Sequence, residues 1–177
     1  MNFNKKVLKV EITGTAAILA IGFIFHELYK ITGNTFVALI CPVNESKWEH
    51  WKIVFWPMVI VSVFEYFILK QDITGFIFPL AVGIISFEAV TFGGIELYEA
   101  VAGKSHLAVH ISTFVLGGIV GQAIKSILMT RFSYSNLLNV VALAIIAVHI
   151  AALTLFTFIP PQIEYFRDSI TGKYGIP

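Results

Sequence analysis

Charged side chains are scarce in this chain. Only 13% of its 177 residues are Asp, Glu, Lys or Arg, whereas 57% are hydrophobic and the mean hydropathy is +0.83. This composition excludes an ordinary soluble domain and predicts an integral membrane protein whose main partner is the lipid bilayer. The formal net charge is +1 and no basic patch is present, which argues against nucleic acid as a partner.

Cysteine and the common catalytic motifs are also missing or nearly so. Cys41 is the only cysteine, which excludes an internal disulfide and a metal site built from cysteines alone. The sequence has no phosphate-binding glycine loop and no Gly-x-Ser-x-Gly turn. No motif therefore supports covalent catalysis by serine or cysteine. The candidate functional residues are carboxylates and imidazoles.

Long apolar runs account for most of the chain. A helix needs about 20 apolar residues to cross the hydrocarbon core of a bilayer. Five runs have about that length, at 11–29, 48–70, 73–93, 106–129 and 136–158. The apolar piece 35–41 is too short to span and is expected to be interfacial or re-entrant. The predicted fold is all-α, a polytopic transmembrane helix bundle over 1–159, followed by a polar tail, 160–177, that could act as a lid.

Basic residues near the ends of spans usually set the orientation of a membrane protein. Here they are tied at six on each side. Because the first helix usually dominates, the basic arm at Lys5, Lys6 and Lys9 places the N-terminus in the cytoplasm and, after five spans, the C-terminus outside. Small residues on the fourth span, including Gly117 and Gly121, allow close helix contact and suggest a homodimer.

The richest polar segment lies at the start of the second predicted span. It reads Pro42-Val43-Asn44-Glu45-Ser46-Lys47-Trp48-Glu49-His50-Trp51-Lys52. Ser46 followed by Glu49 is a capping-box pattern, which gives Glu49 a structural interpretation and leaves Glu45 without one. A carboxylate beside an imidazole is also a general acid–base pair. We therefore take Glu45, Glu49 and His50 as the candidate catalytic residues if the protein is an enzyme.

Five alternating spans would bring most titratable groups to one end of the bundle. Glu65 and Glu88 lie within apolar runs, where a carboxylate must find a partner or be protonated. They suggest a polar track through the bundle, with two neutral hydrogen-bonded carboxyls as the alternative. The predicted binding residues are His26, Asn44, Glu45, Glu49, His50, Lys52, Glu65, Glu88 and Asp168.

Two histidines on the fourth predicted span form a possible metal site. His106 and His110 are four residues apart and so share one face of a helix. They could bind a zinc ion together with His50, Glu45 or Glu49. The alternative is that His106 interacts with water or lipid headgroups, while His110 pairs with a carboxylate.

The polar segment also carries a resemblance to a known family. The motif at 42–52, with His26 upstream and the ending Phe166-Arg167-Asp168-x-x-Thr171-Gly172-x-Tyr174-Gly175, resembles a family of small bacterial multi-span proteins of unknown function. The resemblance covers the whole chain and implies a bacterial cell membrane, but it implies no activity. It suggests that Arg167, Asp168 and Tyr174 fold back on the Glu/His cluster. The His106/His110 pair is not part of this motif.

Three functions are compatible with these residues. The leading hypothesis is that the cluster binds or transports a small polar or cationic solute, with Glu65 and Glu88 continuing the path. The second is a metal-dependent membrane hydrolase acting on a lipid or amide bond, with His50, His106 and His110 as ligands. The third is an accessory or structural subunit that docks a partner.

Overall fold

The computed structural model describes residues 5–176 and is mainly helical within that range. Its elements are α1 (Lys5–Thr32), α2 (Thr35–Ala38), α3 (Trp51–Leu69), α4 (Ile77–Ala102), α5 (Leu107–Arg131), α6 (Asn136–Phe158) and the 3-10 turn η1 (Glu164–Phe166). No strand occurs between residues 5 and 176, where one isolated bridge joins Arg167 and Tyr174. The all-α prediction is confirmed, and the short apolar piece at 35–41 begins as α2.

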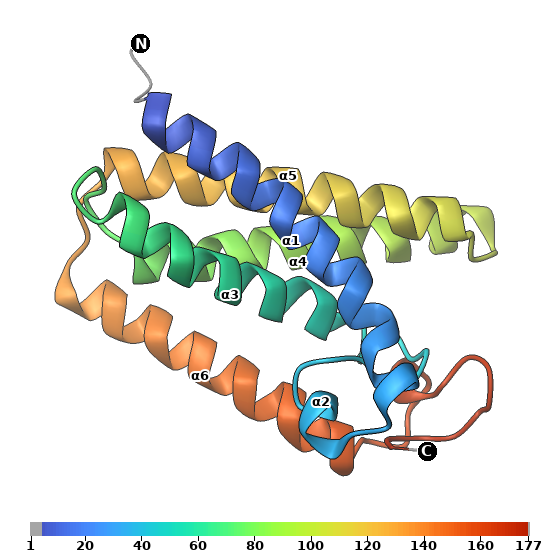
Figure 1. The fold of residues 1–177 in the computed structure, drawn as a ribbon. Coiled ribbons are helices and arrows are strands. Elements are labelled where there is room, and N and C mark those ends of the chain that lie inside the picture. The colour runs from blue at the N-terminus through green and yellow to red at the C-terminus, as the bar shows by residue number, and fades with distance from the viewer. Residues whose placement is uncertain (1–4, 177) are drawn as a thin grey trace.

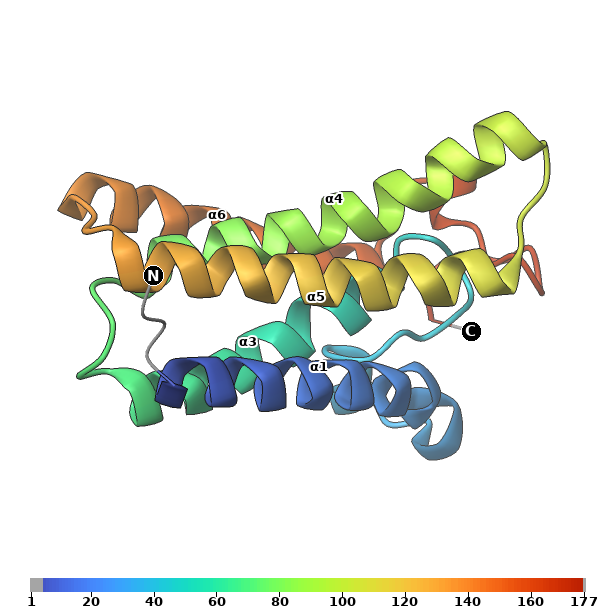
Figure 2. The same cartoon turned by 90° about the horizontal axis from the view of Figure 1, so that it is seen from above.

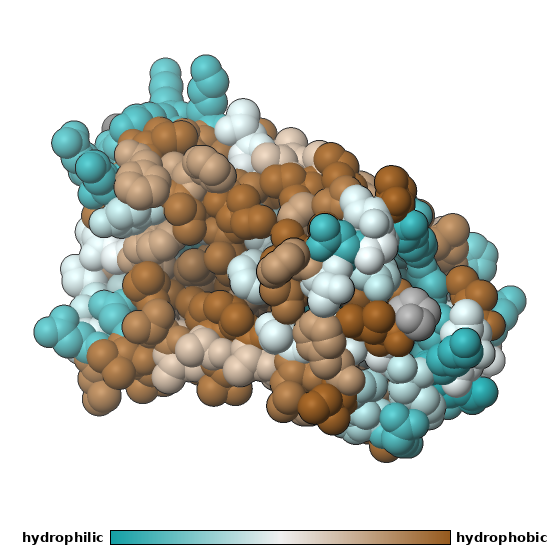
Figure 3. Space-filling model, turned by 60° about the horizontal axis from the view of Figure 1, so that its bottom comes forward, coloured by the Kyte–Doolittle hydropathy of each residue, from teal (hydrophilic) through white to brown (hydrophobic). Residues whose placement is uncertain are grey.

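Five of the helices, all except α2, are long and apolar enough to cross a membrane. Their outward side chains are largely apolar, and the space-filling view shows a broad hydrophobic band between hydrophilic ends (Figure 3). The third of these helices extends past the predicted end at residue 93 and stops at Ala102, where Gly103 takes a left-handed conformation, φ 66°. These features are those of a multi-pass membrane protein.

The long helices lie side by side, so that their connections gather at two ends (Figure 1). One end holds α2 with the rest of the α1–α3 connection, the α4–α5 connection and the C-terminal tail, and we call it the motif end. The opposite end holds the start of α1 and the α3–α4 and α5–α6 connections. Helix α4 packs most extensively along α5 and α1 along α3, while α6 lies against α4. Seen from above, α1 and α4 lie on either side of α5 (Figure 2).

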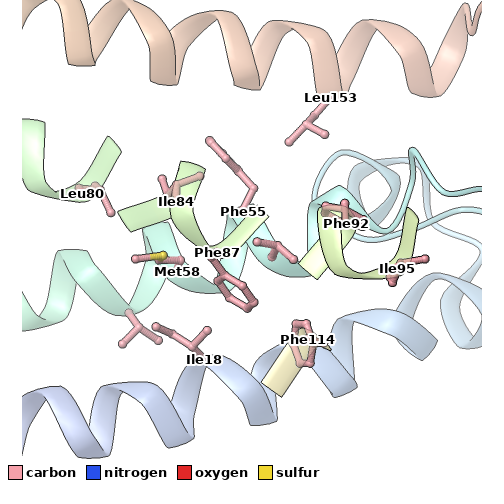
Figure 4. Packing of buried hydrophobic residues seen from close by; sticks show 12 residues of the cluster. Ile18, Phe55, Met58, Leu80, Ile84, Phe87, Phe92, Ile95, Phe114 and Leu153 are labelled. Atoms are coloured by element: carbon pink, nitrogen blue, oxygen red, sulfur yellow. The ribbon is translucent and has the colours of Figure 1, made fainter. Parts of the chain in front are cut away.

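The middle of the bundle is filled by apolar side chains from all five long helices (Figure 4). Phe87 of α4 and Phe114 of α5 have ring centroids 5.4 Å apart, and Phe55 and Met58 of α3 are fully buried beside them. Dense packing of this kind leaves little room for water in this part of the bundle. The core therefore lies between the polar groups of the motif end and those of the opposite end.

Glycine lets α4 and α5 approach closely. A Cβ atom on Gly121 of α5 would lie 2.7 Å from the carbonyl oxygen of Gly83 in α4. On the same helix, a Cβ atom on Gly118 would lie 2.9 Å from the Leu19 side chain of α1. Small residues at such contacts allow helix backbones to meet. The glycine face that suggests a homodimer is thus used for packing within one chain, and the homodimer stays a prediction without that support.

Candidate functional site

The polar motif is held in place by a buried ion pair. Lys52 and Glu49 are 0% and 2% exposed, and Lys52 Nζ lies 2.7 Å from Glu49 Oε2. Lys52 also donates to the carbonyl of Ala38, while Glu49 accepts from Val43 N (3.0 Å) and Thr157 Oγ1 (3.0 Å). Each oxygen of Glu49 is therefore engaged. The pair fixes the 39–50 loop to α3 and to the end of α6.

The predicted capping box is half formed. Ser46 Oγ accepts a hydrogen bond from Glu49 N (3.3 Å), as that motif requires. The Glu49 side chain, however, turns to Val43 N, and Asn44 Oδ1 takes its place by accepting from Ser46 N (2.9 Å). Helix α3 begins at Trp51, after a turn that leaves Glu45 and His50 facing α1.

Three side chains converge on one point at the motif end. His26 comes from the last part of α1, and Glu45 and His50 come from the loop. His26 Nε2 and His50 Nε2 are 3.1 Å apart, and Glu45 Oε2 lies 3.4 Å from His50 Nε2 and 3.7 Å from His26 Nε2. We call these residues the His/Glu trio. All three are partly exposed, in contrast to the Glu49–Lys52 pair.

The other ring nitrogen of each histidine is held by an acceptor. His50 Nδ1 lies 2.7 Å from the carbonyl oxygen of Ser46, and His26 Nδ1 lies 2.6 Å from Glu27 Oε1. A carbonyl and a carboxylate can only accept, so in the neutral rings the hydrogen sits on Nδ1. Both Nε2 atoms then present lone pairs to each other at 3.1 Å. Such a contact is repulsive unless a proton or a metal ion lies between the two atoms.

Glu45 adds a fixed negative charge to the trio. Its Oε2 faces the histidines, and its Oε1 lies 2.6 Å from Lys30 Nζ. A hydrogen bond from His50 Nε2 when the ring is protonated, together with the contact with Lys30, outweighs burial and lowers the pKa of Glu45 to about 2. The carboxylate is therefore ionised throughout the physiological range.

The trio has the dimensions of a metal site. Ligands placed about 2.0–2.1 Å from a tetrahedral ion are roughly 3.3–3.4 Å from one another, and the three separations here are 3.1, 3.4 and 3.7 Å. Histidine ligands of metals commonly donate their second nitrogen to a carboxylate or a carbonyl. Glu27 and Ser46 provide these two acceptors. The donor set and its supports therefore fit a divalent ion such as zinc.

The trio borders a cavity of about 510 Å³ between α1, α3, α4 and α5. Its mouth is polar: Lys47 Nζ lies 2.6 Å from both Glu96 Oε1 and Glu99 Oε2, and His110 Nε2 lies 3.4 Å from Glu99 Oε1. Most of the remaining wall is apolar, formed by Phe23, Ile53, Val54, Phe92, Ile95, Leu107, Ile111 and Phe114. The cavity thus combines polar groups with an apolar wall, as an amphiphilic ligand would require.

The C-terminal tail folds over the motif. Asp168 Oδ1 accepts from Glu45 N (3.2 Å), and Ser169 Oγ donates to the carbonyl of Glu45 (3.1 Å). Asn44 Nδ2 donates to the carbonyl of Gly175 (2.8 Å), and Tyr165 OH accepts from Trp51 Nε1 (2.9 Å). Asp168 and Ser169 hold the backbone N–H and the carbonyl of Glu45, so the tail positions a member of the trio.

The structure groups the predicted metal ligands differently from the sequence. His106 is exposed and caps α5, its Nδ1 accepting from Ala108 N (3.2 Å). His110 pairs with Glu99 across the α4–α5 connection, as the alternative interpretation expected. Of the set His50, His106 and His110, only His50 is in the trio, where His26 is its imidazole partner. The spacing of two histidines along one helix does not predict a site formed by a helix end and a loop.

Glu65 and Glu88 both lie deep in the bundle, as predicted, and have separate partners. Glu65 contacts Lys125 and Gln122 of α5, and Glu88 Oε1 lies 3.0 Å from His149 Nε2 of α6. The core residues Phe55, Met58, Val61, Phe87 and Phe114 fill the bundle between the trio and Glu65. No polar track connects the motif end with Glu65 among the described residues.

Fold and site together define a class: a multi-pass α-helical membrane protein with a His/Glu trio beside a cavity at one end of the bundle. The chain belongs to a family of unknown function (DUF6512), whose family model matches residues 1–176. Membership of an uncharacterised family, predicted from the motifs, is thereby confirmed. No curated protein and no solved structure matches the chain.

Proposed function

We propose that the protein is a membrane-embedded, metal-dependent hydrolase that cleaves an ester or amide bond of an amphiphile. The observation that carries this proposal is the trio, in which two lone-pair nitrogens and one carboxylate oxygen meet within 3.7 Å. Two histidines and one glutamate, with a fourth position open to substrate, are a typical catalytic zinc set. This geometry favours the hydrolase over the solute binder that the sequence ranked first.

The cavity supports an amphiphilic substrate. A polar headgroup would lie at the mouth, beside the trio and the Lys47–Glu96–Glu99 group, and an apolar chain would lie against Phe23 and Phe114. The cavity lies between helices long enough to span a membrane, which is where the apolar chain of such a molecule would be accommodated. The scissile bond, at the junction of head and chain, would then lie next to the trio.

Hydrolysis of such a bond needs an activated water and a proton for the leaving group. A divalent ion bound by the trio would lower the pKa of water and polarise the carbonyl. The water loses its first proton to solvent, its oxygen bonds to the carbonyl carbon, the C–O or C–N bond breaks, and the second water proton passes to the leaving oxygen or nitrogen, so that a carboxylate and an alcohol or amine are released. His110, which lines the cavity and is oriented by Glu99, is our candidate to carry that proton.

Glu49 is not assigned a catalytic role. Its carboxylate already accepts from Val43, Lys52 and Thr157, and it does not line the cavity. A general base needs a free acceptor within reach of the substrate. Of the two motif glutamates, Glu45 is the one with an oxygen directed at the histidines, and we assign it as a ligand.

Binding or transport of a cationic amphiphile is the second candidate. The carboxylates of Glu45, Glu96 and Glu99 all line the cavity, where they are opposed by Lys30 and Lys47. Release of either lysine would leave an anionic mouth suited to a positive headgroup. This candidate needs no metal, and so metal content separates the two.

The test is the metal content of detergent-purified protein, measured by elemental mass spectrometry after exposure to zinc and dialysis. The wild type should hold close to one ion per chain, and His26→Ala and His50→Ala should lose it. His106→Ala is the control, because His106 lies outside the trio, and it should keep the ion. Retention of the ion in both trio variants, or a metal-free wild type, would overturn the proposal.

Activity is tested next on the zinc-loaded protein, with a fluorogenic ester and a fluorogenic amide that carry an acyl chain. Cleavage should disappear in His50→Ala and fall in His110→Ala, which should still bind zinc. A metal-free protein that is stabilised against heat by a quaternary ammonium amphiphile would instead support the second candidate, since a ligand bound only to the native state raises apparent stability.

A further inference from the structure

A second polar cluster lies buried toward the opposite end of the bundle and takes no part in the proposed hydrolysis. It joins α1, α3 and α5 through Glu11, Glu65, Gln122 and Lys125, whose exposed fractions are 5%, 4%, 1% and 0%. It contains two carboxyl groups and one ammonium. Because the cluster lies within membrane-spanning helices, a net charge on it would be energetically costly.

Glu65 takes up most of the donors in this cluster. Lys125 Nζ is in close contact with Glu65 Oε2 and also donates to Ser62 Oγ (3.1 Å), while Gln122 Nε2 donates to Glu65 Oε1 (2.5 Å). Glu65 and Lys125 thus form an ion pair whose charges cancel. The second carboxyl group of the cluster, on Glu11, lies outside this ion pair.

Glu11 has no hydrogen-bond partner on either carboxyl oxygen, although both oxygens are buried. The cation nearest to it, Lys125 Nζ, is 3.7 Å from Glu11 Oε2 and already serves Glu65. Helix α3 adds only the Glu65 carboxylate to its surroundings, and α5 adds Lys125 and the neutral Gln122. Gln122 Oε1 is also buried and lacks a donor. An ionised Glu11 would therefore be an excess negative charge beside another carboxylate.

We propose that Glu11 is a proton-binding site that is occupied at neutral pH. With one proton bound, the two carboxyls and the ammonium sum to zero charge, and the Glu11 hydroxyl can donate a hydrogen bond in a cluster that contains an unpaired amide oxygen. This proposal does not depend on the proposed hydrolase activity.

The proton bears on the arrangement of α1. Helix α1 is continuous from Lys5 to Thr32 and carries Glu11 near one end and His26 near the other. Loss of the proton would place uncompensated charge where α1 packs on α3 and α5, and so would weaken the contacts that hold α1. The far end of the same helix supplies one wall of the cavity and one member of the trio. Proton occupancy at Glu11 is thereby linked to the integrity of the site.

The test compares two isosteric variants, Glu11→Gln and Glu65→Gln, by infrared spectroscopy and thermal unfolding in the same detergent at neutral pH. The carbonyl stretch of a buried protonated carboxylic acid should be present in the wild type and lost in Glu11→Gln. Glu11→Gln, a mimic of the protonated group, should keep the wild-type melting temperature. Glu65→Gln removes the carboxylate in close contact with Lys125 and leaves only the Glu11 carboxyl at 3.7 Å, so its melting temperature should fall by roughly 10 °C.

Glu164→Gln is the control, because this exposed glutamate is paired only with Arg167; it should change neither the carbonyl stretch nor the melting temperature. The proposal is overturned if the protonated carbonyl signal is as strong in Glu11→Gln as in the wild type, or if Glu11→Gln melts as low as Glu65→Gln. Neither readout involves metal or substrate, so failure here is distinguishable from failure of the hydrolase.

Discussion

Two glutamates of one loop, four residues apart, have opposite surroundings. Glu49 is buried and its carboxylate is saturated by a main-chain N–H, an ammonium and a hydroxyl. Glu45 is partly exposed, with one oxygen on Lys30 and the other facing two imidazoles. The first is fully engaged by the fold, whereas the second lies beside two rings whose contact is relieved by a proton or a metal ion.

The difference shows how a membrane protein can hold a reactive cluster in place. A buried, fully paired charge fixes the loop, because breaking it would leave the partner uncompensated. The neighbouring charge is then kept in an arrangement that local hydrogen bonds do not satisfy, which is typical of functional sites. The changes below should separate loss of the fold from loss of the site.

The largest effect is expected from Lys52→Met, which leaves the Glu49 carboxylate buried without its cation. The free energy of unfolding should fall by about 3–5 kcal/mol, measured by thermal unfolding followed through the fluorescence of Trp48 in the loop and Trp51 at the start of α3. Lys47→Met is the matched control, because Lys47 is more than a third exposed and such pairs contribute less than about 1 kcal/mol. Equal melting temperatures for the two variants would contradict a structural role for the Glu49–Lys52 pair.

Glu45→Gln should have the reverse profile. The amide keeps the size of the side chain, so the melting temperature should stay close to that of the wild type. Zinc affinity should fall by more than about 100-fold, because loss of a ligand costs more than the 10–100-fold typical of a residue that supports one. Titration calorimetry measures the affinity, and Glu96→Gln, on the other side of the cavity, is the control. Unchanged zinc affinity in Glu45→Gln would remove Glu45 from the site.

A smaller loss of affinity is expected from Glu27→Ala. Glu27 does not reach the point where the trio converges, but its carboxylate holds His26 Nδ1 at 2.6 Å and so directs Nε2 toward His50. Removing such a support typically lowers metal affinity by about 10–100-fold. Calorimetry should show that decrease with no change in stoichiometry. An affinity equal to that of the wild type would mean that His26 is oriented by the helix alone.

Sequence reasoning reached the fold, and it named His26, Glu45 and His50 among its candidate binding residues without grouping them as a trio. Apolar runs of membrane length are local signals, and so all five long helices were predictable. The capping pattern gave Glu49 a structural interpretation, but its side chain pairs with Lys52 and leaves the return bond of the cap to Asn44. The grouping of the trio was not predictable, because it depends on the end of α1 meeting the 39–50 loop, and that contact is set by tertiary packing. Lys125 as the partner of Glu65 was missed for the same reason: the two residues are 60 positions apart.

The smallest effect is expected in the tail, from Asp168→Asn. The carboxylate accepts from Glu45 N, Ile170 N and Thr171, and an amide side chain has only one accepting oxygen. Because the bonds from Thr171 go to the second oxygen, their loss should destabilise the docked tail by about 1–2 kcal/mol, which corresponds to roughly 5–30-fold faster exchange. Hydrogen–deuterium exchange of 165–176 measures it. Exchange as slow as in the wild type would show that Asn44 and Tyr165 hold the tail without Asp168.

Acid should have the same effect on the wild type. Burial alone would raise the pKa of Asp168, but the hydrogen bonds from Thr171, Ile170 and Glu45 outweigh it and hold the pKa below the ordinary value of 3.8. A carboxylate with a depressed pKa stabilises the fold fully above its unfolded pKa and loses that contribution as the pH falls through the folded value. Tail exchange, corrected for its intrinsic pH dependence, should therefore accelerate below pH 3.8 in the wild type. In Asp168→Asn that acid step should be absent, because the titrating group is gone while the rest of the tail is unchanged.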